Sequence, residues 1–151
     1  MRAVVDTSTL VSLARAGHLG ILELSGLTPV LLDVVHAEAV DAGRAGGHAD
    51  AAAIEAAVAG HELNPVDPIG SVDARVLRAA ASVGLLLTND LALGRRARNV
   101  GVRWLRTADL VVLAHRSGRL DAPAARAVIV ALRDAGRLTA ALADAYVEEL
   151  S

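Results

Sequence analysis

The sequence predicts an α/β fold: a parallel-sheet α/β/α sandwich with further helices at the C-terminus. Apolar runs of strand length alternate with helical patterns along the chain, which favours parallel strands joined by helices. Apolar residues make up 54% of the sequence, yet there is no Phe, one Trp and one Tyr, so aliphatic side chains must build the core. Two of the strand-like runs also end at an acid that starts a helix.

The N-terminal part of the chain contains two predicted strands. Residues 2–6 form a short β-branched run, and a helix over 8–16 follows it until Gly17, a residue typical of helix ends. A short turn through 19–24 leads to a second strand at 28–32.

A longer helical stretch comes next. Asp33 is a favoured N-cap for a helix over 34–42. The glycine-rich segment 43–47 predicts a flexible break, the most disorder-prone loop of the chain. A helix over 49–59 and a short strand at 62–63 follow.

The middle of the chain predicts two further strands. Ser71 caps a helix that reaches residue 82, and residues 85–88 are the most strand-like run of the second half. A helix over 91–99 then leads to a last strand at 102–105.

The rest of the chain predicts only helices. Each begins after a residue that favours the N-cap position, and a proline in the first turn supports the second of them. The three caps are Thr107, Asp121 and Thr139, before helices over 108–116, 122–135 and 140–150.

Length and composition limit the class of protein. The chain of 151 residues fits one domain, 1–151, and such a domain buries roughly two-thirds of its unfolded surface. With no cysteine, disulfides, thiolate zinc sites and cysteine nucleophiles are excluded. All fifteen basic residues are arginine, so Walker-type phosphate loops and Schiff-base chemistry, which need lysine, are excluded too. No apolar run approaches ~18 residues and no signal peptide is visible, so we expect a cytoplasmic protein.

Two acids occupy the carboxyl ends of predicted strands. Asp6 ends the first strand, and Asp90 follows the run 85–88. Each alone is explained as a helix N-cap, as are Asp33 and Asp121. In open α/β sheets, however, ligands bind at the carboxyl ends of the strands, so Asp6 and Asp90 are expected at one edge.

Two further acids interrupt the apolar stripes of their helices. Glu38 follows Val34 and Val35 at helical spacing and lies on or beside the stripe that should face the core. Asp73 has Val76 and Leu77 at i+3 and i+4. The alternatives are a solvated face for Glu38 and a helix-dipole interaction for Asp73.

Together, the four acids predict a divalent metal site. No lysine is present to neutralise them, and clustered carboxylates repel one another unless a cation lies between them. Oxygen ligands suit Mg²⁺ or Mn²⁺, which polarises a phosphoryl group and lowers the pKa of a bound water.

Four segments in this order resemble the acidic motifs of the PIN-domain family, in its VapC-like toxin ribonuclease subgroup. They are Val4-Val5-Asp6-Thr7-Ser8, Val35-His36-Ala37-Glu38-Ala39-Val40, Val72-Asp73-Ala74-Arg75-Val76-Leu77 and Leu87-Thr88-Asn89-Asp90. The segment 105–150 is similar to the tail of that subgroup. The third motif departs from the pattern, because Val72-Asp73 stands where the subgroup often has Gly-Glu.

This resemblance implies a PIN-like domain that acts as a metal-dependent endoribonuclease with Mg²⁺ or Mn²⁺, leaving a 5′-phosphate and a 3′-hydroxyl. Asp6, Glu38, Asp73 and Asp90 would be its catalytic and metal-binding residues, with Asp6 and Asp90 touching the metal. Ser8 would hold a ligand water or a phosphate. The resemblance also implies an RNA substrate and the toxin role of a toxin–antitoxin pair, with an antitoxin protein as partner.

Other polar residues have supporting or structural interpretations. The resemblance makes Asn89 a candidate to orient the acids. Arg95, Arg96 and Arg98, together with Arg103 and Arg106 beside the next predicted strand, are candidates to hold RNA phosphates, with a solvated helix face as the alternative. The five histidines show no metal-binding spacing. Trp104 is expected in the core or in an interface. The apolar C-terminal helices suggest a homodimer.

Three other functions share some of these sequence features. A phosphotransferase of the haloacid-dehalogenase type needs a second Asp two residues after the first, where Ser8 stands. A receiver domain needs an acidic pair and a lysine. A catalytically degenerate PIN-like module that binds protein or RNA remains the main alternative to the nuclease.

Overall fold

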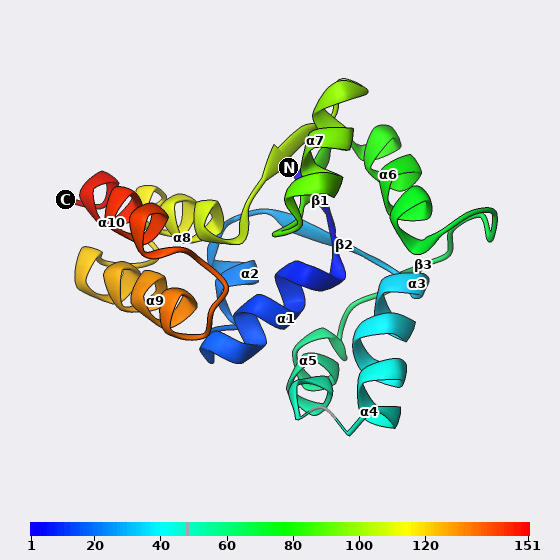
Figure 1. Ribbon diagram of the computed structural model, residues 1–151, viewed down its shortest axis with the longest axis horizontal. Coiled ribbons are helices and arrows are strands. Elements are labelled where there is room, and N and C mark those ends of the chain that lie inside the picture. The colour runs from blue at the N-terminus through cyan, green and yellow to red at the C-terminus, as the bar shows by residue number, and fades with distance from the viewer. Residues whose placement is uncertain (48) are drawn as a thin grey trace.

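The computed structural model describes residues 1–47 and 49–151 and has a five-stranded parallel sheet at its centre (Figure 1). The strand order is β3-β2-β1-β4-β5, and every neighbouring pair is parallel. The strands are β1 (Arg2–Val5), β2 (Thr28–Leu32), β3 (Leu63–Asn64), β4 (Leu85–Leu87) and β5 (Arg103–Leu105). The predicted parallel α/β class is confirmed, and each strand lies within two residues of its expected bounds.

The order of the strands reverses between β1 and β4. The chain builds outwards from β1 through β2 to β3, then returns to the other side of β1 with β4 and continues to β5. Val5 pairs with Leu87, so β1 and β4 end side by side. A crevice forms outside the carboxyl ends of two such strands, because their connections leave in opposite directions.

Helices cover both faces of the sheet. Figure 1 shows α6 and α7 on one side of the strands and α1, α8 and α9 on the other. A π-helix, η1 (Ala37–Ala42), lies between α3 and α4. The α-helices are α1 (Thr7–Ala16), α2 (Ile21–Leu24), α3 (Asp33–His36), α4 (Gly43–Ala45), α5 (Asp50–Val58), α6 (Val72–Val83), α7 (Leu91–Asn99), α8 (Thr107–Arg116), α9 (Ala122–Asp134) and α10 (Ala140–Glu149).

The core is aliphatic, as the composition predicts. All three residues of β4 are leucines with at most 2% of their surface exposed, because helices pack on both faces of this central strand. Residues 3–5 of β1 are fully buried beside them. This packing holds the ends of β1 and β4, and hence the acids that follow them, in fixed positions.

The predicted flexible break at residues 43–47 is partly wrong. Helical structure continues from α3 through η1 and α4 to Ala45, so the helix is longer than the expected 34–42. The π turns keep Ala39 and Val40 buried against the core, and this packing outweighs the low helix propensity of Gly43. His48, one of the histidines considered above, lies outside the described residues.

Three of the predicted N-caps are confirmed and two are wrong. The side chains of Ser71, Asp121 and Thr139 accept hydrogen bonds from the third residue beyond each of them. Asp33 instead is the first residue of α3, and its carboxylate accepts a bond from the next N–H. Thr107 is the first residue of α8, and Arg106 occupies the N-cap position instead. The Asp109 carboxylate accepts the backbone N–H of Arg106 and fixes it there.

One glycine permits a close contact between α7 and β5. Gly94 lies in α7 directly against the indole of Trp104, and a Cβ built on it would be 2.1 Å from the Trp104 Cε2 atom. The Trp104 indole N–H donates to the Thr88 carbonyl at 2.9 Å. The absence of a side chain at residue 94 therefore decides where the only tryptophan lies.

We predict that Gly94→Ala destabilises the protein by roughly 1–3 kcal/mol, because the added methyl group overpacks the contact with Trp104. In most helix positions the same change would stabilise by up to about 1 kcal/mol. Urea unfolding followed by the fluorescence of Trp104 measures the effect. Gly60→Ala is the control, since a Cβ there meets nothing within 4 Å. Equal stability of both variants would contradict the packing argument.

Candidate functional site

Asp6 is held by two hydroxyl groups at the end of β1. Its side chain is 5% exposed. It occupies the N-cap position of α1 without capping the helix. Instead, its Oδ2 atom accepts hydrogen bonds from Thr88 Oγ1 at 2.7 Å and from Ser8 Oγ at 2.8 Å. The cap interpretation of Asp6 is therefore wrong, because the hydroxyl groups have taken the place of the helix N–H donors.

The same hydroxyl groups connect Asp6 to the end of β4. Ser8 Oγ accepts the backbone N–H of Asn89 at 2.9 Å, and Thr88 Oγ1 accepts that of Asp90 at 3.1 Å. Each hydroxyl thus accepts from the β4–α7 turn and donates to Asp6. This arrangement joins β1 and β4 across the point where the strand order reverses.

Asp90 caps α7 and still keeps one oxygen free. Its Oδ1 atom accepts the backbone N–H groups of Ala92 and Leu93, at 2.9 and 3.1 Å. No described residue donates to its Oδ2, and none donates to Oδ1 of Asp6. Each of the two carboxylates is therefore oriented by two bonds to one oxygen, while the other oxygen is available to a ligand.

Asp73 brings a third carboxylate to the same edge. It lies in the first turn of α6, is half-buried, and accepts no hydrogen bond within the described residues. Burial raises its pKa, and the nearby carboxylates of Asp6 and Asp90 raise this pKa further, while Arg96 opposes them. A cation bound between these carboxylates would relieve their mutual repulsion.

Glu38 does not lie on the apolar stripe, and this expectation is wrong. It is on η1, in the helical segment that follows β2, and its side chain is exposed. Val35, Ala39 and Val40 are the buried residues of this helix. The π turns change the angular spacing of the side chains, so the α-helical period no longer identifies the inward face. No hydrogen bond or ion pair joins Glu38 to another described residue.

Ser8 and Asn89 are both structural partners of the site. The Ser8 hydroxyl is committed to Asp6, as described above. The Asn89 amide donates to Ser12 Oγ at 3.3 Å and to the carbonyl of Arg137 at 2.9 Å. Arg137 Nε also donates to Ser12, at 2.9 Å. Asn89 therefore attaches the β4–α7 turn to α1 and to the segment between α9 and α10.

The predicted RNA-binding arginines of α7 are exposed but differ in their surroundings. Arg96 is close enough to Asp73 to lower its pKa. The guanidinium of Arg98 lies over the Trp104 ring, 5.6 Å from its centroid. Arg95 has no hydrogen bond or ion pair with any described residue.

The sequence analysis missed the roles of Thr88 and Trp104. A threonine directly after a buried strand could have indicated a hydroxyl donor at the carboxyl edge of the sheet.

The carboxylate oxygens of this site are the type of ligand that a hard cation prefers. The ligands offered by Asp6, Asp73 and Asp90 are all oxygens, and each of these acids keeps at least one oxygen that no described residue bonds. Within residues 1–47 and 49–151, however, no three or more acidic or histidine side chains are grouped closely enough to hold a metal ion between them. Mg²⁺ commonly binds only one or two carboxylates and completes its shell with waters and substrate phosphates. A pair of acids such as Asp6 and Asp90 offers that number of carboxylates.

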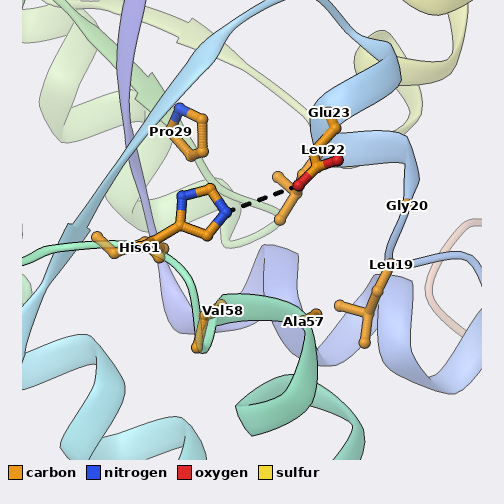
Figure 2. A pocket seen from close by; sticks show the side chains of 9 residues that line it. Leu19, Gly20, Leu22, Glu23, Pro29, Ala57, Val58 and His61 are labelled. Carbon is orange, nitrogen blue, oxygen red and sulfur yellow. Dashed lines mark ion pairs between the residues drawn. The ribbon is translucent and has the colours of Figure 1, made fainter.

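A separate pocket lies at the opposite end of the sheet. Figure 2 shows it beside Pro29, near the start of β2, and His61, just before β3. Its volume is about 150 Å³, and His61 Nε2 lies 3.7 Å from Glu23 Oε1 at its side. The pocket is at the amino ends of the strands, so none of the four acids lines it.

Comparison with known proteins adds no relative: no protein-family model, no curated protein and no solved structure matches the chain. Within the part of the chain that the structure describes, none of the helices combines the length and the apolar character that a membrane-crossing segment requires. Function must therefore be argued from the site.

We predict that Thr88→Val costs about 1–3 kcal/mol of stability, because the buried Asp6 carboxylate loses one of its two hydroxyl donors and the Asp90 N–H loses its acceptor. Thr107→Val is a matched control. Both threonines are at most 1% exposed, but the Thr107 hydroxyl has no hydrogen-bond partner to lose. Urea unfolding at pH 7 compares the two variants. A loss of stability in Thr107→Val as large as in Thr88→Val would contradict the role given to the Asp6 hydrogen bonds.

We predict that Asp73→Asn stabilises the folded protein relative to the parent, and that this stabilisation increases as the pH rises. The folded protein raises the pKa of Asp73 above 3.8, so between the unfolded and the folded pKa the native state binds more protons than the unfolded chain. The ionised carboxylate therefore lowers stability progressively as the pH rises through this window. The melting temperature of the variant minus that of the parent, measured from pH 4 to pH 8 without divalent ions, should increase and then level off. A difference that decreases with pH would show that Asp73 is stabilised as an anion.

Proposed function

We propose that this protein is a divalent-metal-dependent endoribonuclease whose site lies between the ends of β1 and β4. The observation that carries the proposal is the pair Asp6 and Asp90, each fixed through one oxygen and open at the other, beside a third carboxylate with a raised pKa. Carboxylates at a topological switch point are in the place where α/β proteins bind ligands. The resemblance of four ordered motifs to the PIN-domain family supports RNA as the substrate.

Asp6 and Asp90 would hold Mg²⁺ or Mn²⁺, and the ion would supply positive charge to the phosphate and acidify a water. Asp73 is suited to accept a proton from that water, because it lies near Asp6 and Asp90 and no described residue donates a hydrogen bond to its carboxylate. Ser8 and Thr88 orient Asp6. Glu38 follows β2 at the same edge and remains a predicted fourth acid.

The biological setting stays a prediction. The toxin role, an antitoxin partner and a homodimer rest on the resemblance and on the apolar C-terminal helices. The alternative, a catalytically degenerate module that binds RNA or protein, is favoured by two observations. Glu38 is exposed, and no group of three or more potential ligands converges in the described residues.

Asp6→Asn is the decisive variant. Its amide oxygen can accept the bonds of Ser8 and Thr88, while an NH₂ group replaces the free oxygen. We expect hydrolysis of labelled RNA in Mg²⁺ or Mn²⁺ to fall on the order of 100-fold or more. Cleavage is followed by gel electrophoresis, with EDTA as a second way to remove activity.

Asp121→Asn is the matched control, because asparagine is an equally good N-cap for α9. It should retain the parent rate, and circular dichroism should show both variants folded. Undiminished cleavage by Asp6→Asn, or in EDTA, would refute the mechanism. Absence of cleavage by the parent with retention of RNA binding would support the degenerate module instead.

A further inference from the structure

The positive charge of this chain is concentrated in the segment that follows Asp90. Residues 91–108, which include α7 and β5, contain five arginines and no acid, although the whole chain has a net charge of −2. None of these five arginines forms an ion pair with a described residue. Elsewhere, Arg116 pairs with Glu149 at 2.7 Å and Arg133 with Asp134 at 3.1 Å. Guanidinium groups without a direct ion pair repel one another when they are close, so they favour an anionic ligand.

Two of these arginines are arranged on the indole of Trp104. The Cζ atoms of Arg98 and Arg106 lie 5.6 and 5.2 Å from the ring centroid. A guanidinium that lies over an aromatic ring still has N–H groups that can donate to phosphate oxygens. The two side chains are thus partly ordered before a ligand arrives, which lowers the entropy lost on binding.

Trp104 connects this surface to the acids. Its indole N–H donates to the carbonyl of Thr88, the residue whose hydroxyl donates to Asp6. Gly94 allows the ring to lie directly on α7. The position of the arginines relative to the site is therefore set by a hydrogen bond and by close packing.

Two surface hollows lie along this path. One has a volume of about 390 Å³ and is lined by Arg98, Gly101, Val102, Arg103 and Trp104. The other, of about 310 Å³, includes Asn89, Leu91, Arg106 and Arg137 among its lining residues. Asn89 and Leu91, the residues on either side of Asp90 in the chain, both line the second hollow. From Asp90 to Arg98, α7 rises about 12 Å at 1.5 Å per residue, a length that suits a polymer better than a single phosphate.

We propose that Arg98, Arg103 and Arg106, arranged around Trp104, form a track for the phosphate backbone of a single-stranded RNA that leads into the acidic site. This inference rests on the proposed function for the identity of the polymer. Phosphates match the arginines through paired N–H donors, and the strand would present a phosphodiester to Asp6 and Asp90. An acidic protein segment is the less favoured occupant, because it would bring further carboxylates to the three acids.

The test measures binding without catalysis. Fluorescence anisotropy of a labelled 15-nucleotide RNA is recorded in EDTA from 50 to 200 mM salt. The variant is the triple change Arg98→Gln, Arg103→Gln and Arg106→Gln. We expect its affinity at 50 mM salt to fall on the order of tenfold or more, and the slope of log K against log salt to decrease by about 0.7 for each lost phosphate contact.

The control removes the same charge elsewhere, through Arg116→Gln, Arg126→Gln and Arg133→Gln in α8 and α9. It should keep the parent affinity and slope, and thermal melting should show both triple variants folded. Equal binding by the two variants would overturn the track, whatever the cleavage result with Asp6→Asn. Tighter binding of poly-glutamate than of RNA, lost in the first variant only, would also overturn it in favour of an acidic protein partner.

Discussion

The hydrogen bonds that Asp6 accepts from Ser8 and Thr88 are the constraint on which the carboxyl edge of this sheet depends. A buried carboxylate needs hydrogen-bond donors, and here the donors come from both sides of the point where the strand order reverses. Because both hydroxyls also accept backbone N–H groups from residues 89 and 90, the ends of β1 and β4 are held together by polar contacts as well as by strand pairing. The position of Asp90 follows from this connection.

The same connection extends outward through Trp104 to the arginines. Thr88 contributes its hydroxyl to Asp6 and its carbonyl to the indole, so one residue orients the acidic side and the basic side of the edge. Negative charge gathers between β1 and β4, and positive charge gathers along α7 and β5. A substrate that carries phosphates and needs a cation at the reacting group would meet both kinds of charge in this arrangement. The close approach at Gly94 packs α7 directly against Trp104.

The periodicity of apolar residues predicted most of the fold, but it did not predict for every acid whether its side chain faces the core or the solvent. The strands and the long helices agree with their expected positions because aliphatic runs and N-cap residues act locally. Glu38 was expected near the core because an α-helical period was applied to residues that form a π-helix. Its widened turns respond to the packing of Ala39 and Val40, which is a tertiary effect. The caps at Asp33 and Thr107 differ for a similar reason, since neighbouring side chains compete for the same N–H groups.

By itself, the sequence determined the parallel α/β class, the acids at two strand ends and the exclusion of thiol and lysine chemistry. These depend on composition and on patterns a few residues long. Only the tertiary structure decided that Asp6 accepts hydrogen bonds from two hydroxyl groups that lie eighty residues apart in the chain. It also decided that Asp73 lies near Asp6 and Asp90 while Glu38 faces solvent, and that two arginines lie over the Trp104 ring. Such contacts join residues distant in the chain, and their geometry is set by strand order and core packing, which no local pattern contains.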